Sequence, residues 1–259
     1  MSTRRCATSS NRLLDALPAK ERDRFFADCT LVDLVAGSVL YEQGDRIRYV
    51  YFPTESSISM LATVDDHSTL EVGMVGREGM CGHALILGGD FASLRALTQG
   101  AGAAWRTDTT TFRRHLENLP ALQPLLDRYV SILLRQLAQT AACTRFHVVE
   151  KRLARWLLMT QDRAQADSFD VTQEFLAFML GVRRVGITTA ASSLQSRKLI
   201  HYRRGSITIL NRDRLEAAAC TCYRFDLEVY RHGMTARARG PGSFRHQRAL
   251  AGPIRTTDA

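Results

Sequence analysis

Hydrophobic residues between positions 31 and 112 come in short runs that glycine, aspartate and serine interrupt. The runs are TLVDLVAGSVLY, YVYFP, SISMLATV, LEVGMVG and RALTQGAGAAW. Runs that recur about every 8–12 residues, with turn residues between them, are typical of antiparallel sandwiches and barrels. Gly37 and Gly44–Asp45 are candidate turns. The leucines within residues 12–30, before the first run, predict a short helical segment.

The apolar positions change to a helical period between Leu122 and Gln161. A repeat in steps of four and three runs through Leu126, Val130, Leu133, Leu137, Thr140 and Thr144. This is the spacing of a coiled-coil seam, which predicts a homodimer of two parallel helices. An ordinary core helix lying on the barrel has the same period, so that alternative stays open. After a joint expected near Arg145–Val149, a further stripe consists of Leu153, Trp156 and Leu157.

Two helices joined by a glycine turn are predicted between Val171 and Ile200. Thr172 suits the N-cap of the first helix, whose apolar stripe is Phe175, Leu176, Met179 and Leu180. Gly181 can adopt the positive φ that ends this helix. The second helix, expected to begin near Arg184, has a stripe that would face the first: Ile187, Ala190, Ala191 and Leu194.

The segment HYRRGSITIL, which follows the second helix, predicts a short basic hairpin with its turn at Gly205–Ser206. Helix, turn, helix and hairpin form a winged helix, whose second helix enters the DNA major groove. Arginine suits guanine edges and phosphates, and threonine suits bases or phosphates. The expected DNA-contacting residues are Thr172, Gln173, Arg183, Arg184, Val185, Thr188, Thr189, Ser192, Arg197, Arg203 and Arg204. A plain helical hairpin with a solvated face is the alternative.

Charge is divided unevenly between the two halves of the chain. The net charge of +9 consists of −2 over residues 1–120 and +11 over residues 121–259, which favours a polyanionic partner for the second half. Residues 231–259 are rich in arginine and glycine, and we expect a disordered basic tail there.

Other classes of protein find little support in the sequence. No apolar run reaches the length of a membrane span, and the N-terminus has no apolar signal core. Six scattered cysteines predict reduced thiols in a cytoplasmic protein. There is no P-loop, GxSxG, HExxH or complete dinucleotide fingerprint, so an enzyme or nucleotide-binding subunit with an incidental helical hairpin is the less favoured alternative.

The order of barrel, long helix and winged helix resembles the Crp/Fnr family of bacterial transcription regulators. The resemblance covers about residues 12–225 and is carried by VLYEQGD, VGREGMCG, EKRLARWLLMTQDR, LGVRRVGITTAASSLQSRKLI, YRRGSITILNRDRLE and CTCY. It implies an α+β protein with an N-terminal cyclic-nucleotide-binding-like β-roll, a long dimerisation helix and a C-terminal winged helix-turn-helix. The family's base-reading positions would fall on Arg184, Val185 and Thr189. Val185 stands where one subgroup has an acidic residue, so the DNA site should differ from that subgroup's.

The resemblance also places an effector pocket in the β-roll. A cyclic nucleotide would need a glutamate after the second glycine of EGMCGHALIL and an arginine just before Ser93, but His83 and Ala92 stand there. We therefore expect no cyclic nucleotide to bind in the usual way, although a cyclic-nucleotide-controlled activator is the alternative. The candidate pocket residues are Glu78, Gly79, Cys81, Gly82, Ser93 and Arg95.

The sequence names no cofactor. Cys6, Cys29, Cys81 and Cys143 are too far apart to predict an iron–sulfur cluster, and His67 and His83, which could ligate haem, fit surface loops better. Cys220 and Cys222 form a close pair, but zinc needs two further ligands, and neither a second CxxC nor an HxxxH accompanies them. We therefore expect this pair to be structural, with no metal, and Cys81 to be the candidate for redox sensing.

These observations predict four parts. Residues 12–120 form the sensor roll, 121–147 the dimerisation helix and hinge, 148–225 the DNA-binding domain and 231–259 the tail. The expected partners are double-stranded DNA, a second copy of the chain and RNA polymerase, with no membrane.

Overall fold

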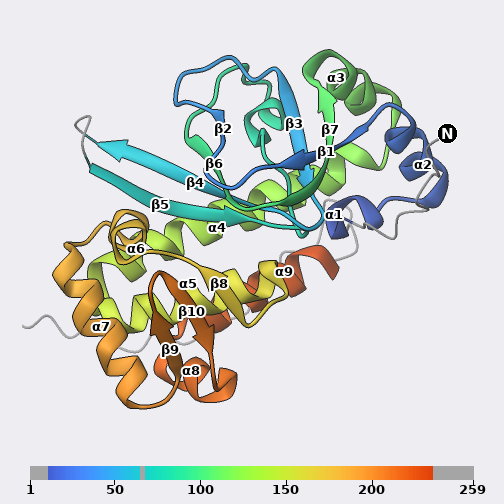
Figure 1. Cartoon of the computed structure of the whole chain (residues 1–259). Coiled ribbons are helices and arrows are strands. Elements are labelled where there is room, and N and C mark those ends of the chain that lie inside the picture. The colour runs from blue at the N-terminus through green and yellow to red at the C-terminus, as the bar shows by residue number, and fades with distance from the viewer. Residues whose placement is uncertain (1–10, 65–67, 236–259) are drawn as a thin grey trace, which may run out of the picture.

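A β-roll, a long helix and a smaller unit of helices and strands follow one another along the chain and pack together (Figure 1). The computed structural model describes residues 11–64 and 68–235. It confirms the expected α+β class. The expectation of a tail beginning at residue 231 is wrong at its start, because residues 231–235 belong to helix α9 (Cys222–Thr235); the remainder, 236–259, lies outside the described residues.

The β-roll contains two antiparallel sheets, a three-stranded one ordered β1-β7-β3 and a four-stranded one ordered β2-β6-β4-β5. Their hydrophobic faces meet in one core, which includes Phe25, Phe52 and Phe112. The elements of this part are α1 (Arg12–Asp15), α2 (Ala19–Ala27), β1 (Thr30–Leu34), β2 (Val39–Tyr41), β3 (Tyr49–Pro53), β4 (Ser57–Val64), β5 (Ser68–Val75), the 3₁₀ helix η1 (His83–Leu87), β6 (Arg95–Gly100), β7 (Gly102–Asp108) and α3 (Thr109–Asn118).

The first helix is fixed to the roll by a buried asparagine. The side-chain oxygen of Asn11 accepts hydrogen bonds from the backbone N–H groups of Leu13 and Leu14, both at 3.1 Å. Its amide nitrogen donates to the carbonyl oxygens of Pro53 and Gly79, both at 2.9 Å. All of these groups are buried and paired, so Asn11 caps α1 and also joins it to the end of β3 and to the loop at Gly79.

The long helix α4 (Leu122–Phe146) lies against the roll, and this corrects the dimer seam. Leu126, Val130 and Leu133 are buried in the core of the roll, and Leu137 packs against the same core. The periodic stripe is therefore an intrachain core stripe and not a free dimer surface. The last member of the predicted set, Thr140, is half-buried, and its hydroxyl accepts a hydrogen bond from Arg155 at 3.1 Å.

The second core belongs to the unit that follows α4. Its three strands form the antiparallel sheet β8-β10-β9, and the joint before it is short, since only His147 and Val148 separate α4 from α5. Its elements are α5 (Val149–Ala164), β8 (Ser168–Asp170), α6 (Gln173–Leu180), α7 (Arg184–Ser196), β9 (Ile200–Arg203), β10 (Ser206–Ile209) and α8 (Arg212–Ala218).

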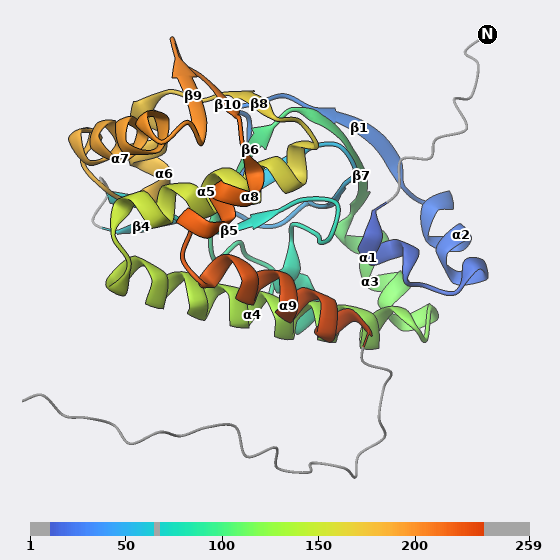
Figure 2. The same cartoon turned by 90° about the horizontal axis from the view of Figure 1, so that it is seen from below.

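Helix α9 leaves this unit and runs back along α4 (Figure 2). Near its start, the side chain of Gln139 donates to Cys222 Sγ at 2.9 Å. One turn on, the guanidinium of Arg135 lies 5.7 Å from the ring centre of Phe225. Near its end, Gly233 faces Ile132 so closely that a Cβ would clash with it. These contacts make α4 and α9 an antiparallel pair.

The roll and the second unit are in direct contact through a buried carboxyl group. Glu71 of β5 accepts hydrogen bonds from Ser59 Oγ at 2.6 Å and from Trp156 Nε1 of α5 at 3.1 Å. Burial raises the pKa of Glu71 to about 7, although both hydrogen bonds favour the charged form. The contact between the two units therefore contains a group that titrates near neutral pH.

The stability of the protein should depend on this carboxyl. Because the pKa of Glu71 is raised on folding, its contribution is complete below the unfolded value of 4.5 and is lost as the pH rises through about 7. In Glu71→Gln, an amide oxygen can still accept from Trp156, but nothing titrates. We expect the free energy of unfolding of the native sequence to fall by up to about 1.4 kcal/mol per pH unit more steeply than that of the variant. Urea unfolding from about pH 5 to 8 measures this difference. Equal slopes would contradict the assignment.

Candidate nucleic-acid interface

The two helices of the predicted helix-turn-helix form as α6 and α7. Thr172 caps α6, since its hydroxyl oxygen accepts from the backbone N–H of Phe175 at 3.1 Å. Gly181 ends the helix with a φ of 58°, in the left-handed region that glycine enters without strain. The turn sets the angle between α6 and α7, and α7 begins at Arg184 as expected.

Helix α7 has one buried and one exposed face. The buried stripe is the predicted one, Ile187, Ala190, Ala191 and Leu194. The side chains on the other side are exposed: Arg183, Arg184, Val185, Thr188, Thr189 and Ser192. We call these six residues the reading face. They combine two cations, hydroxyl groups and one apolar side chain, which is the chemistry that major-groove recognition uses.

Five of the expected DNA-contacting residues, including the N-cap Thr172, already have hydrogen-bond partners within the protein. Thr188 Oγ1 donates to Gln173 Oε1 at 2.8 Å, which ties α7 to the start of α6. Thr189 Oγ1 donates to the carbonyl oxygen of Val185 at 3.0 Å, and its oxygen lone pairs can still accept hydrogen bonds. Arg197 Nη1 lies 2.7 Å from Glu150 Oε1. Gln173 and Arg197 therefore hold the helices in place, in addition to any contact with DNA.

The N-terminus of α7 offers backbone donors. Its N-cap residue, Arg183, makes no side-chain capping hydrogen bond. The first N–H groups of a helix without a side-chain cap, together with the helix dipole, favour an anion such as a DNA phosphate. Arg183 and Arg184 add positive charge at this same end.

The wing is a tight hairpin of β9 and β10. Its register pairs Arg203 with Ser206, so the loop consists of Arg204 and Gly205. The turn is therefore one residue earlier than the expected Gly205–Ser206. Both loop residues have positive φ, 51° and 80°, as a type I′ turn requires. Arg203 and Arg204 are exposed at the tip, and β10 also pairs with β8.

Comparison with known proteins agrees with this geometry. Residues 151–218 match the family model of the Crp-like helix-turn-helix domain, and residues 31–118 match that of the cyclic nucleotide-binding domain. The chain belongs to the Crp/Fnr family of transcriptional regulators. Members of this family are regulators and not enzymes. A search of proteins with curated functions finds no significant match.

Solved structures of Crp/Fnr-type regulators share the fold. CLP of Xanthomonas campestris, described as a c-di-GMP-responsive global regulator, has a TM-score of 0.62 at 19% identity, covering 74% of this chain and 99% of CLP. FixK2 of Bradyrhizobium japonicum has a TM-score of 0.63 at 15% identity, covering 74% of this chain and 98% of FixK2. A putative Crp/Fnr regulator of Eubacterium rectale has a TM-score of 0.62 at 16% identity, covering 82% and 97%. Identities this low show a common fold.

Some residues of the expected effector pocket surround a small cavity. Cys81, Gly82 and Ser93 do come together, around a cavity of about 20 Å³ that Tyr41, Met60 and other side chains also line. A space of this size holds about one water molecule. His83 lines the same cavity and is half-buried, so its assignment to a surface loop is wrong, and burial lowers its pKa. His67 and Cys6 lie outside the described residues.

Three expected pocket residues lie elsewhere. Glu78 pairs with Arg163 of α5 at 2.6 Å, between the roll and the DNA-binding unit. Gly79 packs against the ring of Tyr129, where a Cβ would clash. Arg95 pairs with Glu42 at 3.2 Å and does not line the cavity. The idea that Arg95 takes the place of the phosphate-binding arginine is therefore not supported by the geometry.

Cys81 is also a poor candidate for redox sensing. It is buried beside Tyr41, and burial raises the pKa of its thiol to about 12. Oxidation proceeds through the thiolate, which is scarce at such a pKa.

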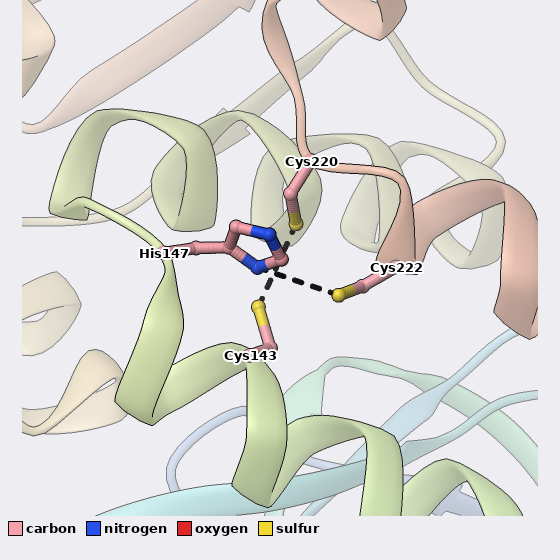
Figure 3. A group of neighbouring side chains, drawn as sticks. All are labelled: Cys143, His147, Cys220 and Cys222. Carbon is pink, nitrogen blue, oxygen red and sulfur yellow. Dashed lines mark hydrogen bonds between the residues drawn. The ribbon is translucent and has the colours of Figure 1, made fainter. Parts of the chain in front are cut away.

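The structure brings together a group of side chains that the sequence analysis did not connect. Cys220 and Cys222 lie beside Cys143 and His147, at the joint between α4 and α5 (Figure 3). The expectation that no two further ligands accompany this pair is therefore wrong. A hydrogen bond between Cys143 and Cys220 lowers the pKa of Cys143 and raises that of Cys220. The distance along the chain, 77 residues between these two, explains why no motif revealed the group.

In the part of the chain that the structure describes, no helix is both long enough and apolar enough to cross a membrane.

The reading face and the wing should contribute differently to DNA binding. Arg184→Ala should cost about 1–3 kcal/mol on the preferred site and relax sequence choice, because a base contact is lost. Arg204→Asn is the matched variant, since asparagine also tolerates positive φ. It should weaken binding evenly on all sequences and reduce the salt slope by about 1, because a phosphate contact is lost. Titrations of a selected site and of scrambled DNA at several salt concentrations measure both. Equal losses on the two DNAs for Arg184→Ala would contradict the base-reading role.

Proposed function

We propose that this regulator binds one specific double-stranded DNA sequence as a homodimer, with the reading face of α7 in the major groove. The observation that carries the proposal is the exposed set of Arg183, Arg184, Val185, Thr188, Thr189 and Ser192 beside a wing with Arg203 and Arg204 at its tip. The +11 charge of the second half supports it. A regulator of this kind acts in the cytoplasm and influences RNA polymerase at a promoter.

The surface for the second copy is the outer face of α4. The residue that follows each position of the original seam is exposed: Asp127, Ser131, Leu134, Ala138, Ala141 and Arg145. This set keeps the same steps of four and three, turned by about 100° around the helix. Leu134, the one large apolar side chain of this set, is 60% exposed, and Phe146, about three turns further along α4, is 75% exposed. A parallel partner helix would cover this stripe.

The roll acts as the effector-sensing part, and its ligand is not a cyclic nucleotide bound in the usual way. The small cavity at Cys81 and Ser93 and the displacement of Glu78 and Arg95 to other ion pairs support this. A cyclic-nucleotide-controlled activator remains the second candidate, because the family model that residues 31–118 match is that of the cyclic nucleotide-binding domain.

Selection of bound DNA from a random pool tests the function directly. We expect enrichment of a near-palindrome whose half-sites lie one helical turn apart, about 34–36 Å. The symmetry of the enriched sequence shows whether a dimer binds, and the sequence of each half-site shows which bases the reading face recognises. Failure to enrich any sequence over competitor DNA would overturn the proposal. A single enriched half-site without symmetry would overturn the dimer.

The outer face of α4 is tested by Leu134→Asp. We expect a monomer in light scattering and specific DNA binding about tenfold weaker or worse, with unchanged far-UV circular dichroism, because the side chain is exposed within the chain. Leu87→Asp is the matched control, since Leu87 is an exposed leucine at the end of η1 and does not belong to the outer face of α4, and this variant should remain dimeric. Leu133→Asp would unfold the roll, because Leu133 is buried there. A dimeric Leu134→Asp would contradict the proposed surface.

A further inference from the structure

Four side chains with metal-binding atoms meet where two joints of the chain lie side by side (Figure 3). Cys143 belongs to the last turn of α4 and His147 follows its end, whereas Cys220 lies between α8 and α9 and Cys222 is the first residue of α9. The ligand atoms of all four lie within 4.8 Å of one another. Cys143 Sγ lies 3.6 Å from Cys220 Sγ, and Cys222 Sγ lies 3.5 Å from His147 Nδ1.

These distances match the edges of a zinc tetrahedron. With Zn–S bonds of about 2.3 Å and a Zn–N bond of about 2.0 Å, two ligand atoms at tetrahedral corners are about 3.5–3.8 Å apart. The two measured pairs are already at this separation, and the remaining pairs need only small side-chain movements. An iron–sulfur cluster places several metal ions between its ligands and so needs a wider arrangement. The size of the group therefore favours one ion.

The packing around the cysteines is that of a ligand set. Buried free cysteines ordinarily serve as small hydrophobic side chains within a core. Here Cys143, Cys220 and Cys222 form a buried cluster apart from the cores of the roll and of the DNA-binding unit. Gln139 donates from its side-chain nitrogen to Cys222 Sγ at 2.9 Å, the kind of outer hydrogen bond that steadies a metal thiolate. Half-buried His147 leaves a route to solvent.

The charge of the surroundings also suits a metal thiolate centre. Three thiolates and a neutral imidazole around Zn²⁺ carry a net charge of −1. The guanidinium groups of Arg152 and Arg155 lie close enough to interact electrostatically with Cys143. Arg152 also donates to the carbonyl oxygen of Leu180, so its position is fixed.

We propose that Cys143, His147, Cys220 and Cys222 bind one Zn²⁺ ion in a closed Cys₃His site that fastens α8 and α9 to the joint between α4 and α5. All four positions of the tetrahedron are filled by the protein, which is the arrangement of a structural site with no position for a substrate. Binding forms three Zn–S bonds and one Zn–N bond and releases the thiol protons to solvent.

The site would control the angle at the joint. Residues His147 and Val148 are the whole connection between α4 and the DNA-binding unit. A metal ion that links His147 to the start of α9 restricts how α5 can turn on α4. If the proposed dimer forms through α4, the ion then holds α7 at a fixed orientation to the dimer. This consequence rests on the proposed function, whereas the metal site itself does not.

Metal content of the full chain tests the site without reference to DNA. Protein purified under reducing conditions with zinc should hold about one zinc ion per chain by elemental analysis. Cys143→Ser and Cys222→Ser should lose it, and His147→Gln, a half-buried position where misfolding is a lesser concern, should weaken zinc affinity by about tenfold or more. Cys29→Ser, which removes a half-buried cysteine of the roll, is the matched control and should keep one ion.

Cobalt substitution tests the ligand set. Co²⁺ in the reduced chain should give the strong visible absorption of a tetrahedral site together with thiolate charge-transfer bands, and both should be absent in Cys222→Ser. Less than a tenth of an ion per chain, a weak octahedral spectrum, or full metal content in Cys143→Ser would overturn the proposal. So would a Cys143–Cys220 disulfide that, once reduced, takes up no metal. If DNA selection fails while zinc binds, the proposed function is wrong and the metal site stands. If the protein holds no zinc while DNA selection succeeds, the metal site is wrong and the proposed function stands.

Discussion

The buried ion pair between Arg155 and Asp226 holds the three long helices together. Its atoms Nη2 and Oδ2 are 2.7 Å apart, and the two side chains are only 8% and 7% exposed. Arg155 also donates to Thr140 of α4, so α5 binds α9 and α4 through one guanidinium. Removing either partner would leave a buried charge uncompensated, at a cost of about 3–5 kcal/mol. The position of α9 along α4 depends on this pair.

Helix α5 is consequently one of the elements that connect the roll with the DNA-binding unit, together with α6, which packs against β5. One side of it reaches the roll, where Trp156 donates to Glu71 and Arg163 donates to the carbonyl oxygen of Met74. Another side packs against α7 and α8 in the second core. Because the core is close-packed, a movement of β5 must either displace α5 or break the hydrogen bond to Glu71. The roll and the DNA-binding unit are thus joined by packed side chains and not by the joint alone.

The sequence patterns correctly predicted helices and most turns. They did not predict which part of the protein each helix or strand packs against. The stripe of Ile187, Ala190, Ala191 and Leu194 and the turn at Gly181 identified α6 and α7 correctly, because period and turn residues act within a few residues. The stripe containing Leu126, Val130 and Leu133 identified a helix correctly, but a period cannot distinguish a partner chain from the chain's own roll. The more apolar stripe of α4 packs into the core of the roll. The same limit applies to Glu78 and Arg95. Their ion-pair partners, Arg163 and Glu42, lie far from them in the sequence and come beside them only in the folded chain.

The group of Cys143, His147, Cys220 and Cys222 comes from two short segments far apart in the chain, so no single sequence motif contains it. Each half has a short spacing, three residues between Cys143 and His147 and one between Cys220 and Cys222, but neither half is sufficient for zinc. What joins them is the antiparallel packing of α9 on α4, which Arg155 and Asp226 secure next to the cysteines. A buried ion pair therefore sets the geometry of the ligand set. The converse also holds, because an ion at the joint would resist the separation of α9 from α5 that exposes the two charges. If the proposed ion binds, the two interactions are expected to strengthen each other.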